Sequence, residues 1–317
     1  MKTKIVYTVV SGNGDIYLPQ AMVAAYTARR YNPSANIILV TDQPTSSVID
    51  AKLSAIKNYV NDVVVVDLPE ELSNMQRSRY LKTTLRRNVK GDFLYIDTDT
   101  VVTRDLSEID NLKIEIGAVL DRHIKIDKHI YQKKIKKDVS AVGLKISDLR
   151  NCYYNGGVIF VKDTPLAYEL YDLWHKYWND SRVNGKSIDQ PALAKANKDC
   201  NYPIQELNGI WNCQLSDNFI NYLADAKILH YFASNKKSPY KLFDNDIFLG
   251  ILNNGDLPNR IRLFLENPKQ IFREKHQLIF DDDVDFSNTY VHTMYSYHKR
   301  IFNIMEYISK VIVTKKT

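Results

Sequence analysis

The chain has 317 residues, of which 44% are hydrophobic and 25% are charged, a composition typical of one large α/β domain with an appendage. Its net charge of +6 permits anionic partners such as nucleotides, nucleic acid or acidic lipid head groups, but it selects none of them. No apolar stretch approaches the length of a membrane span, and the three cysteines lack the spacing of metal or redox sites. We therefore expect a reduced, cytoplasmic protein without an export signal.

Strand-like and helix-like segments alternate four times in the first hundred residues. Strands are predicted at 4–10, 36–41, 62–67 and 93–96, and helices at 18–31, 46–59 and 71–89. The third strand contains four consecutive valines, which predicts that it is fully buried. This alternation predicts a mixed, mainly parallel sheet that is covered on both faces by helices, in which ligands bind at the carboxyl ends of the strands.

A glycine-containing loop, Ser11–Asp15, joins the first strand to the first helix. In open α/β sheets such a loop offers backbone N–H groups to a phosphate or a base. Thr8, Asp15 and Tyr17 are therefore candidate nucleotide contacts. A simple tight turn explains the glycines about as well.

The strand at 93–96 is apolar and ends abruptly in Asp97-Thr98-Asp99. Two carboxylates at the tip of a buried strand repel each other and are costly to desolvate, so they require a cation. A hard divalent ion such as Mg²⁺ or Mn²⁺, with diphosphate oxygens completing its shell, meets this requirement. The alternative is an ordinary turn that is rich in Asp and Thr.

The helix before this strand carries five cations, Arg77, Arg79, Lys82, Arg86 and Arg87. Arg79, Lys82 and Arg86 follow one another at helical spacings of four or three and therefore share one face. That face either points toward the two carboxylates, where it can hold a diphosphate, or is an ordinary solvated helix face.

Two further polar segments lie beside predicted strands after the acidic pair. A strand at 114–120 ends in Asp121, and residues 122–150 are polar, lysine-rich and without clean periodicity, which indicates a surface excursion over the site or a non-specific charged face. Asn155-Gly156-Gly157 then leads into a buried strand, where the glycines indicate the close approach of another backbone or a ligand. Asn155 offers both the donor and the acceptor that sugar recognition requires.

Three segments follow. A helix at 165–178 has aromatic residues at helical spacing, which we interpret as core packing. A short helix begins near Asp189 and Gln190, and Asp189 can be its N-cap. A strand at 226–232 contains His230, which on its own is more typical of a core histidine than of a metal ligand.

Four motifs in this order resemble the family 8 glycosyltransferases of the GT-A fold. They are Asp-Thr-Asp at 97–99, Tyr-Tyr-Asn-Gly-Gly-Val-Ile-Phe at 153–160, Asp-Gln-Pro-Ala-Leu at 189–193 and Leu-His-Tyr-Phe at 229–232. The resemblance covers residues 4–240 and implies a nucleotide-sugar donor, usually UDP-linked, and Mn²⁺ or Mg²⁺. The mixed carboxylate and imidazole set suits Mn²⁺ better than Ca²⁺.

The resemblance also implies residue roles. Asp97, Asp99 and His230 match the metal ligands, while Asn155, Asp189 and Gln190 match positions that hold the donor sugar near its reacting carbon. The remaining matches are candidate nucleotide and diphosphate contacts: Thr98, Arg79 or Lys82, and Lys236 or Lys237. The loop Ser11–Asp15 departs from the family pattern, so the residues that contact the base stay open.

The predicted function is metal-dependent, retaining transfer of a hexose from a UDP-sugar to a saccharide or glycolipid acceptor, in the synthesis of lipopolysaccharide or a capsular or other surface glycan. One alternative is a nucleotidyltransferase of sugar phosphates, but Ser11–Tyr17 contains no cation to grip a triphosphate. The other is an inactive nucleotide-sugar-binding scaffold. A nucleic-acid partner is not expected, because ordered aromatic and basic interleaving is absent from the sequence.

Residues 241–317 lie outside the resemblance and form a predicted, mainly helical extension to a catalytic domain at 1–240. Short helical segments are expected at 243–252 and 260–265, followed by an acidic turn at 281–285. From His298 the chain is apolar at helical spacing, with basic residues at both ends. Such a helix either lies on an anionic membrane surface, at the inner face of the cell membrane, or docks on the catalytic domain or a sister subunit.

Overall fold

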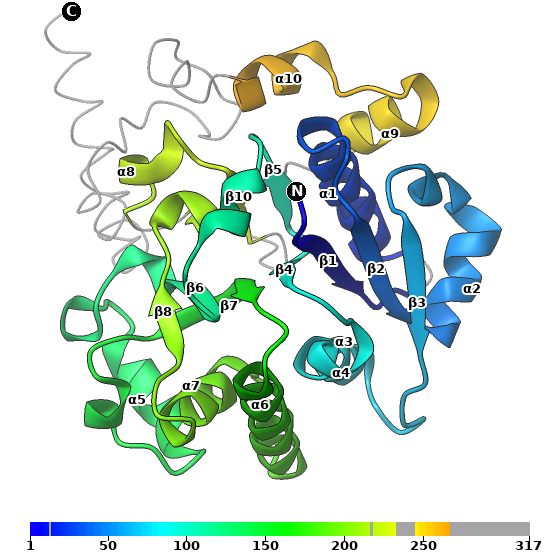
Figure 1. The fold of residues 1–317 in the computed structure, drawn as a ribbon. Coiled ribbons are helices and arrows are strands. Elements are labelled where there is room, and N and C mark those ends of the chain that lie inside the picture. The colour runs from blue at the N-terminus through cyan, green and yellow to red at the C-terminus, as the bar shows by residue number, and fades with distance from the viewer. Residues whose placement is uncertain (13, 216–217, 233–244, 267–317) are drawn as a thin grey trace, which may run out of the picture.

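The computed structural model describes residues 1–12, 14–215, 218–232 and 245–266. The described strands are β1 (Lys4–Val9), β2 (Ile37–Asp42), β3 (Asp62–Val66), β4 (Phe93–Ile96), β5 (Thr100–Val102), β6 (Ile116–Leu120), β7 (Tyr154–Val161), β8 (Ile204–Glu206), β9 (Cys213–Gln214) and β10 (Ile228–His230). They form a seven-stranded sheet in the order β3-β2-β1-β4-β7-β6-β8 and a three-stranded sheet in the order β5-β10-β9 (Figure 1).

The described α-helices are α1 (Tyr17–Tyr31), α2 (Gln43–Lys52), α3 (Asn74–Thr83), α4 (Leu85–Asn88), α5 (Gln132–Ser140), α6 (Pro165–Val183), α7 (Gln190–Asp199), α8 (Ile220–Leu223), α9 (Asn245–Asn254) and α10 (Asn259–Glu266). Within the described ranges, no helix combines the length and the apolar character that crossing a membrane requires.

The large sheet is mainly parallel, as predicted. β1 pairs in parallel with β2 and β4, β2 pairs in parallel with β3, and β6 pairs in parallel with β8. β7 is the exception, because it runs antiparallel to both of its neighbours, β4 and β6. It therefore joins the parallel strands of the first half of the chain to the strands of the second half.

The two faces of the large sheet contribute to separate apolar cores, as the alternation of side chains along a strand requires. On β1, Ile5 and Tyr7 belong to the core that contains α1, whereas Val6 belongs to the core that contains residues of α3, α4, α6 and α7. Trp174, Trp178 and Tyr171 of α6 are fully buried in the second core, which confirms core packing for these residues of the aromatic stripe, whereas Tyr168 is 36% exposed.

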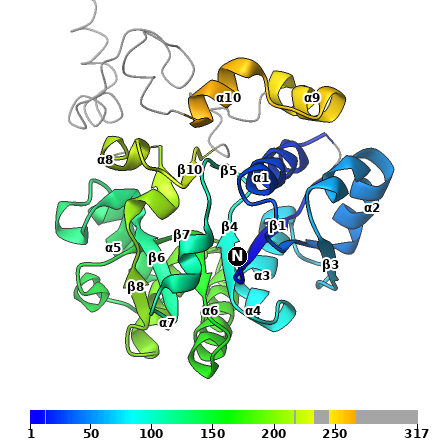
Figure 2. The same ribbon diagram turned by 45° about the horizontal axis from the view of Figure 1, so that its top comes forward.

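Helix α9 contacts α1 (Figure 2), and Arg30 Nη2 of α1 lies 3.7 Å from Glu266 Oε1 of α10. Ile251 of α9 and Phe264 of α10 are buried in the same core as the α1 side chains. The Tyr26 hydroxyl donates to Asp256 Oδ1 at 2.7 Å, which ties the α9–α10 connection to α1. The expected helical segments near 243–252 and 260–265 are therefore confirmed where they are described, whereas 281–285 and the segment from His298 lie outside the described residues.

The prediction of a fully buried strand at 62–67 was wrong. β3 is at the edge of the large sheet and pairs only with β2 in the strand order, and Val65 is 40% exposed. A run of valines indicates β structure through its packing on a pleated surface, but it does not distinguish an edge strand from a central one.

Two predicted helices are interrupted. The segment at 46–59 forms α2, which begins earlier because Asp42 accepts from Thr45 N, and then a separate 3₁₀ turn at Ser54–Asn58. The segment at 71–89 begins only after Ser73, which forms a capping box with Gln76, and it breaks at Thr84 between α3 and α4.

The excursion at 122–150 is on the surface but is more regular than predicted. It contains α5 and has its own small apolar core, in which Ile135 and Val139 of α5 are buried with Leu149 and Tyr153. The lysines of α5 occupy the opposite, exposed face. The interspersed lysines concealed this short amphipathic helix from the sequence-based interpretation.

The edge position of β3 gives a testable difference between adjacent strands. Val40→Ala in β2, where Val40 is fully buried, is expected to lower the free energy of unfolding by about 2 kcal/mol, because two methyl groups leave a packed core. Val65→Ala in β3 is the matched control and is expected to cost less than about 1 kcal/mol. Urea unfolding measures both, and equal losses would contradict the edge assignment.

Candidate active site

Asp97, Asp99 and His230 come together beside the end of β4. Each offers one ligand atom, and the three atoms lie within 4.8 Å of one another. His230 Nε2 is 3.2 Å from Asp99 Oδ1, and the His230 side chain is only 3% exposed. β10 brings the histidine here because it pairs antiparallel with β5, which directly follows Asp99. We call these three residues the Asp–Asp–His cluster.

The space at this cluster depends on Gly157 of β7. A Cβ at position 157 would lie 2.4 Å from His230 Cε1 and 2.9 Å from Asp97 Oδ2, far inside contact distance. A residue without a side chain therefore lets the imidazole and the carboxylate converge. Two carboxylates and an imidazole within reach of one ion are a donor set that suits Mn²⁺ or Mg²⁺, so the residues present fit a divalent cation.

Asp97 is held from the β4 side by Tyr95 and Lys82. The Tyr95 hydroxyl donates to Asp97 Oδ1, and burial raises the pKa of Tyr95 well above its ordinary value, so the phenol keeps its proton. Lys82 Nζ lies 3.2 Å from Asp97 Oδ1. Thr8 is buried behind this pair, with its hydroxyl 3.2 Å from the Tyr95 hydroxyl. Thr8 thus supports the carboxylate from behind.

Two of the three cations predicted to share a face, Arg79 and Lys82, point toward the site, whereas Arg86 belongs to α4 and binds the Val89 and Gly91 carbonyls instead. Lys82 is 5% exposed and also lies 3.7 Å from Asp189 Oδ2, while Arg79 Nε lies 3.0 Å from Asp189 Oδ1. The charge of Asp189 raises the pKa of Arg79 further. The alternative of a solvated helix face is therefore wrong for Lys82, and Asp189 makes no side-chain cap for α7 because its carboxylate binds these cations.

Asp99 is the other carboxylate of the cluster. Burial acts to raise its pKa, but the charge of His230 and its hydrogen bond hold the pKa of Asp99 below its ordinary value. The backbone carbonyl of Asp99 accepts from Tyr231 N at 3.1 Å. The acid is thus ionised and rigidly placed. Thr98, between the two acids, lies in a bend and is half-buried.

The residues predicted to hold the donor sugar border this cluster. Asn155 is 7% exposed, and its Oδ1 accepts from Gly157 N at 2.9 Å and from Asn212 Nδ2 at 3.0 Å. Its Nδ2 donates to Asp121 Oδ1 at 3.1 Å. Gln190 Nε2 donates to the Tyr154 carbonyl at 2.8 Å, so that its amide is anchored to β7.

Sequence reasoning missed Asn212 and His129. Asn212 is fully buried, and its Oδ1 lies 3.0 Å from His230 Nδ1. His129 Nε2 lies 3.2 Å from Asp121 Oδ2 and attaches the excursion at 122–150 to the end of β6. Burial acts to raise the pKa of Asp121, but hydrogen bonds from His129 and Asn155 hold it below its ordinary value. No local pattern marks Asn212 or His129, because their partners are distant in the chain.

The opening loop is organised around Asp15. Its carboxylate accepts from Ser11 Oγ and from Gly12 N, both at 2.6 Å, and from Tyr17 N at 3.1 Å. Tyr17 is 40% exposed at the start of α1. Asp15 therefore shapes the loop, and Tyr17 is free to meet a ligand. Lys236 and Lys237, the candidate diphosphate lysines, lie outside the described residues.

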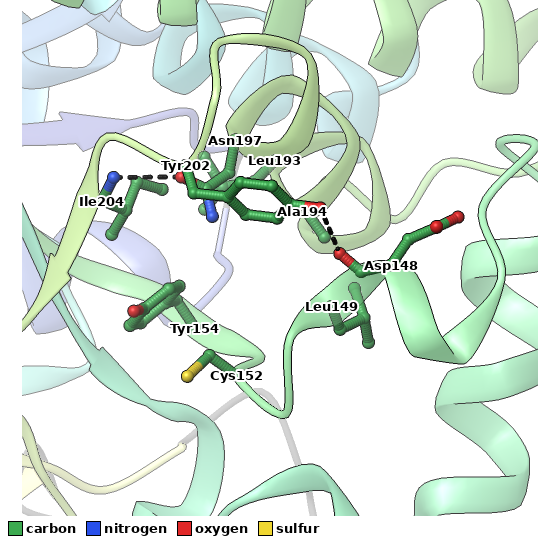
Figure 3. Close-up of a pocket in the computed structure, with 9 residues that line it drawn as sticks. All are labelled: Asp148, Leu149, Cys152, Tyr154, Leu193, Ala194, Asn197, Tyr202 and Ile204. Carbon is green, nitrogen blue, oxygen red and sulfur yellow. Dashed lines mark hydrogen bonds between the residues drawn. The ribbon is translucent and has the colours of Figure 1, made fainter.

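A small pocket elsewhere does not compete with this site. It is lined by Leu193, Ala194 and Asn197 of α7 together with Tyr154, Ile204 and four neighbours that Figure 3 labels. Asn197 already accepts from Ile204 N, and the Tyr202 hydroxyl donates to the Asp148 carbonyl. Its cavity volume of about 10 Å³ holds no more than one water molecule.

The fold is similar to that of solved glycosyltransferases. The WbbM bifunctional glycosyltransferase matches with a TM-score of 0.52 and 16% identity, over 84% of this chain and 52% of that one. The apo form of the glycosyltransferase GlyE of Streptococcus pneumoniae TIGR4 matches with a TM-score of 0.53 and 14% identity, over 86% of this chain and 64% of that one. The chain thus spans about half of WbbM and under two thirds of GlyE. At these identities the likeness shows a shared fold, that of the GT-A glycosyltransferases.

The family follows from a second comparison. The family model described as Glycosyl transferase family 8 matches residues 9–238, which include every described residue of the site except Thr8. The chain therefore belongs to glycosyl transferase family 8. A search of curated proteins gave no match.

The glycine beneath the cluster gives a sharp prediction. Gly157→Ala is expected to abolish the binding of Mn²⁺, because the new methyl group would displace the His230 ring or Asp97. Gly156→Ala is the matched control, since its Cβ would meet only Lys82 and Asp189, at ordinary contact distances of 3.5 Å and more. Titration of each folded variant with Mn²⁺ measures the effect. Unchanged Mn²⁺ affinity in Gly157→Ala would contradict this account of the site.

Proposed function

We propose that this glycosyltransferase moves a hexose from a UDP-sugar to a saccharide acceptor and depends on Mn²⁺ or Mg²⁺. The observation that carries the proposal is the convergence of Asp97, Asp99 and His230 in a space that Gly157 keeps open. These three residues would hold the ion. When bound, such an ion supplies Lewis-acid and electrostatic stabilisation of the diphosphate leaving group.

The cations of α3 take the next role in the proposal. Lys82 is buried between Asp97 and Asp189, so its charge is fixed at the site and weakly screened. Lys82 and Arg79 would attract the donor diphosphate, and Lys236 or Lys237 would share the charge that develops on it. Tyr17, Thr98 and the loop shaped by Asp15 are the proposed nucleotide contacts.

The donor sugar is proposed to lie against Asn155, Asp189 and Gln190. The second N–H of Asn155 would meet a sugar hydroxyl, and the Asp189 carboxylate, held by Arg79 and Lys82, would stabilise positive charge on the sugar ring. We propose that transfer retains the anomeric configuration and that the departing phosphate takes the proton of the acceptor hydroxyl. The acceptor class proposed is a lipopolysaccharide or another surface glycan.

The proposed ligand role of Asp99 has a direct test. Asp99→Asn is expected to reduce UDP release from the donor at least 100-fold while the protein stays folded, because a neutral amide is a poor ligand for Mn²⁺. Asp172→Asn is the control, since Asp172 on α6 forms an exposed ion pair with Arg87 and takes no part in the site. Normal turnover by a folded Asp99→Asn protein would refute the metal assignment.

Calorimetric titration with a panel of nucleotide sugars, with Mn²⁺ and with EDTA, separates this proposal from its rivals. Metal-dependent binding of one UDP-sugar, followed by UDP release with an acceptor, supports the transferase. Release of pyrophosphate from a nucleoside triphosphate and a sugar phosphate would support a nucleotidyltransferase. Binding without turnover on any acceptor would support a scaffold.

We also propose that residues 241–317 are an extension to a catalytic unit at 1–240, with a basic amphipathic end that holds the enzyme at an anionic membrane surface. The sequence from His298 onward supports this, being apolar at helical spacing between basic residues. The full chain is expected to sediment with anionic vesicles, whereas a chain ending at Tyr297 is not. Neutral vesicles are the control. Equal sedimentation of both chains with anionic vesicles would refute the proposal that the segment from His298 binds the membrane.

A further inference from the structure

A chain of buried side-chain hydrogen bonds runs from the Asp–Asp–His cluster to the far side of the site. His230 Nδ1 lies 3.0 Å from Asn212 Oδ1, and Asn212 Nδ2 donates to Asn155 Oδ1 at 3.0 Å. Asn155 Nδ2 then donates to Asp121 Oδ1 at 3.1 Å, and Asp121 Oδ2 lies 3.2 Å from His129 Nε2. Asn212 is 0% exposed, Asn155 7% and His129 4%. We call these five side chains the buried polar chain.

Backbone groups fix the direction of every bond in this chain. Gly157 N can only donate, so the Asn155 atom that it meets at 2.9 Å is the amide oxygen. That assignment turns Asn155 Nδ2 toward the carboxylate of Asp121, which is the acceptor that an amide N–H needs. If Asn155 were flipped, its NH₂ group would face the N–H donors of Gly157 and Asn212, and its oxygen would face Asp121 Oδ1. Both contacts would be repulsive, so the orientation of Asn155 is determined.

The orientation of Asn212 follows from that of Asn155. Because Asn155 Oδ1 is an acceptor, the Asn212 atom against it is the NH₂ group, and the opposite atom is an oxygen. That oxygen faces His230 Nδ1 and requires a donor there. We infer that Asn212 is a positioning residue that keeps a hydrogen on His230 Nδ1, so that Nε2, which faces Asp99 Oδ1, would be the ring atom that binds a cation held with Asp97 and Asp99.

A backbone N–H group also fixes the hydrogen position on His129, at the end of the buried polar chain that is distant from the Asp–Asp–His cluster. Tyr131 N donates to His129 Nδ1 at 3.1 Å, so His129 carries its hydrogen on Nε2 and donates it to Asp121. Both carboxylate oxygens of Asp121 are therefore engaged within the protein. Two backbone N–H groups, of Gly157 and Tyr131, thus fix the direction of each bond: donation runs from His230 through Asn212 and Asn155 to Asp121, and from His129 to Asp121. The inference about metal affinity rests on the metal site proposed above, whereas the position of the ring hydrogen does not.

The ring hydrogen can be observed directly in the full-length, metal-free protein. Long-range ¹H–¹⁵N correlation spectra of the histidine rings, with His230→Gln to assign the signals, are expected to show a hydrogen on Nδ1 of His230. A deprotonated Nδ1 would overturn the inference. This measurement needs neither activity nor a bound ion, so it does not depend on the success of the proposed function.

Substitution tests the consequence for the ion. Asn212→Leu is expected to raise the dissociation constant for Mn²⁺ alone by about 10–100-fold, because the ring loses its second partner. Asn212→Asp keeps an acceptor for Nδ1–H and is expected to bind Mn²⁺ more tightly than Asn212→Leu. Asn197→Leu is the matched control. Asn197 is a buried amide of α7 that accepts from Ile204 N and is not part of the buried polar chain.

The outcomes are distinguishable. Folded Asn212→Leu that binds Mn²⁺ as tightly as the wild type would overturn the positioning role, and so would an equal loss in Asn197→Leu. Failure of the wild type itself to bind Mn²⁺ would refute the proposed metal site, and the spectra would still decide whether Asn212 holds the hydrogen on Nδ1.

Discussion

The antiparallel pairing of β4 with β7 is the contact on which the site depends. It ends with Asp97 N donating to the Gly157 carbonyl at 2.7 Å, so the carboxylate that ends β4 lies directly over the glycines of β7. The first half of the chain supplies the acids and the cations of α3, while the second half supplies Asn155 and His230. Because Gly157 lacks a side chain, these two halves meet without a steric barrier.

Electrostatics explains why this arrangement holds together before any ligand arrives. The Asp189 side chain is 9% exposed and that of Asp97 is 27% exposed. Because a carboxylate with little access to water is costly when unpaired, Lys82 lies between the two acids and Arg79 binds Asp189 from its other side. Asp99 has His230 as its partner. The site therefore presents acids already balanced by cations.

The buried polar chain connects residues that are far apart in the sequence. His129 belongs to the excursion at 122–150, Asp121 ends β6, Asn155 begins β7 and His230 ends β10. Hydrogen bonds with fixed directions resist reorientation, since turning any one amide leaves buried groups unpaired on both sides. Through His129 and Asp121, the surface excursion is thus hydrogen-bonded to the same framework that holds His230.

The sequence alone determined the alternation of strands and helices, the two acids at the end of a buried strand and the order of motifs that resembles family 8. These are local patterns, because hydrophobic periodicity and strand-end carboxylates are legible within a dozen residues. Tertiary structure decided that the valines at 63–66 form an edge strand, that Lys82 faces inward and that Asp189 binds cations instead of capping its helix. It also selected Asn212 and His129, because their roles come from partners between 8 and 57 residues away, and no local pattern carries that information.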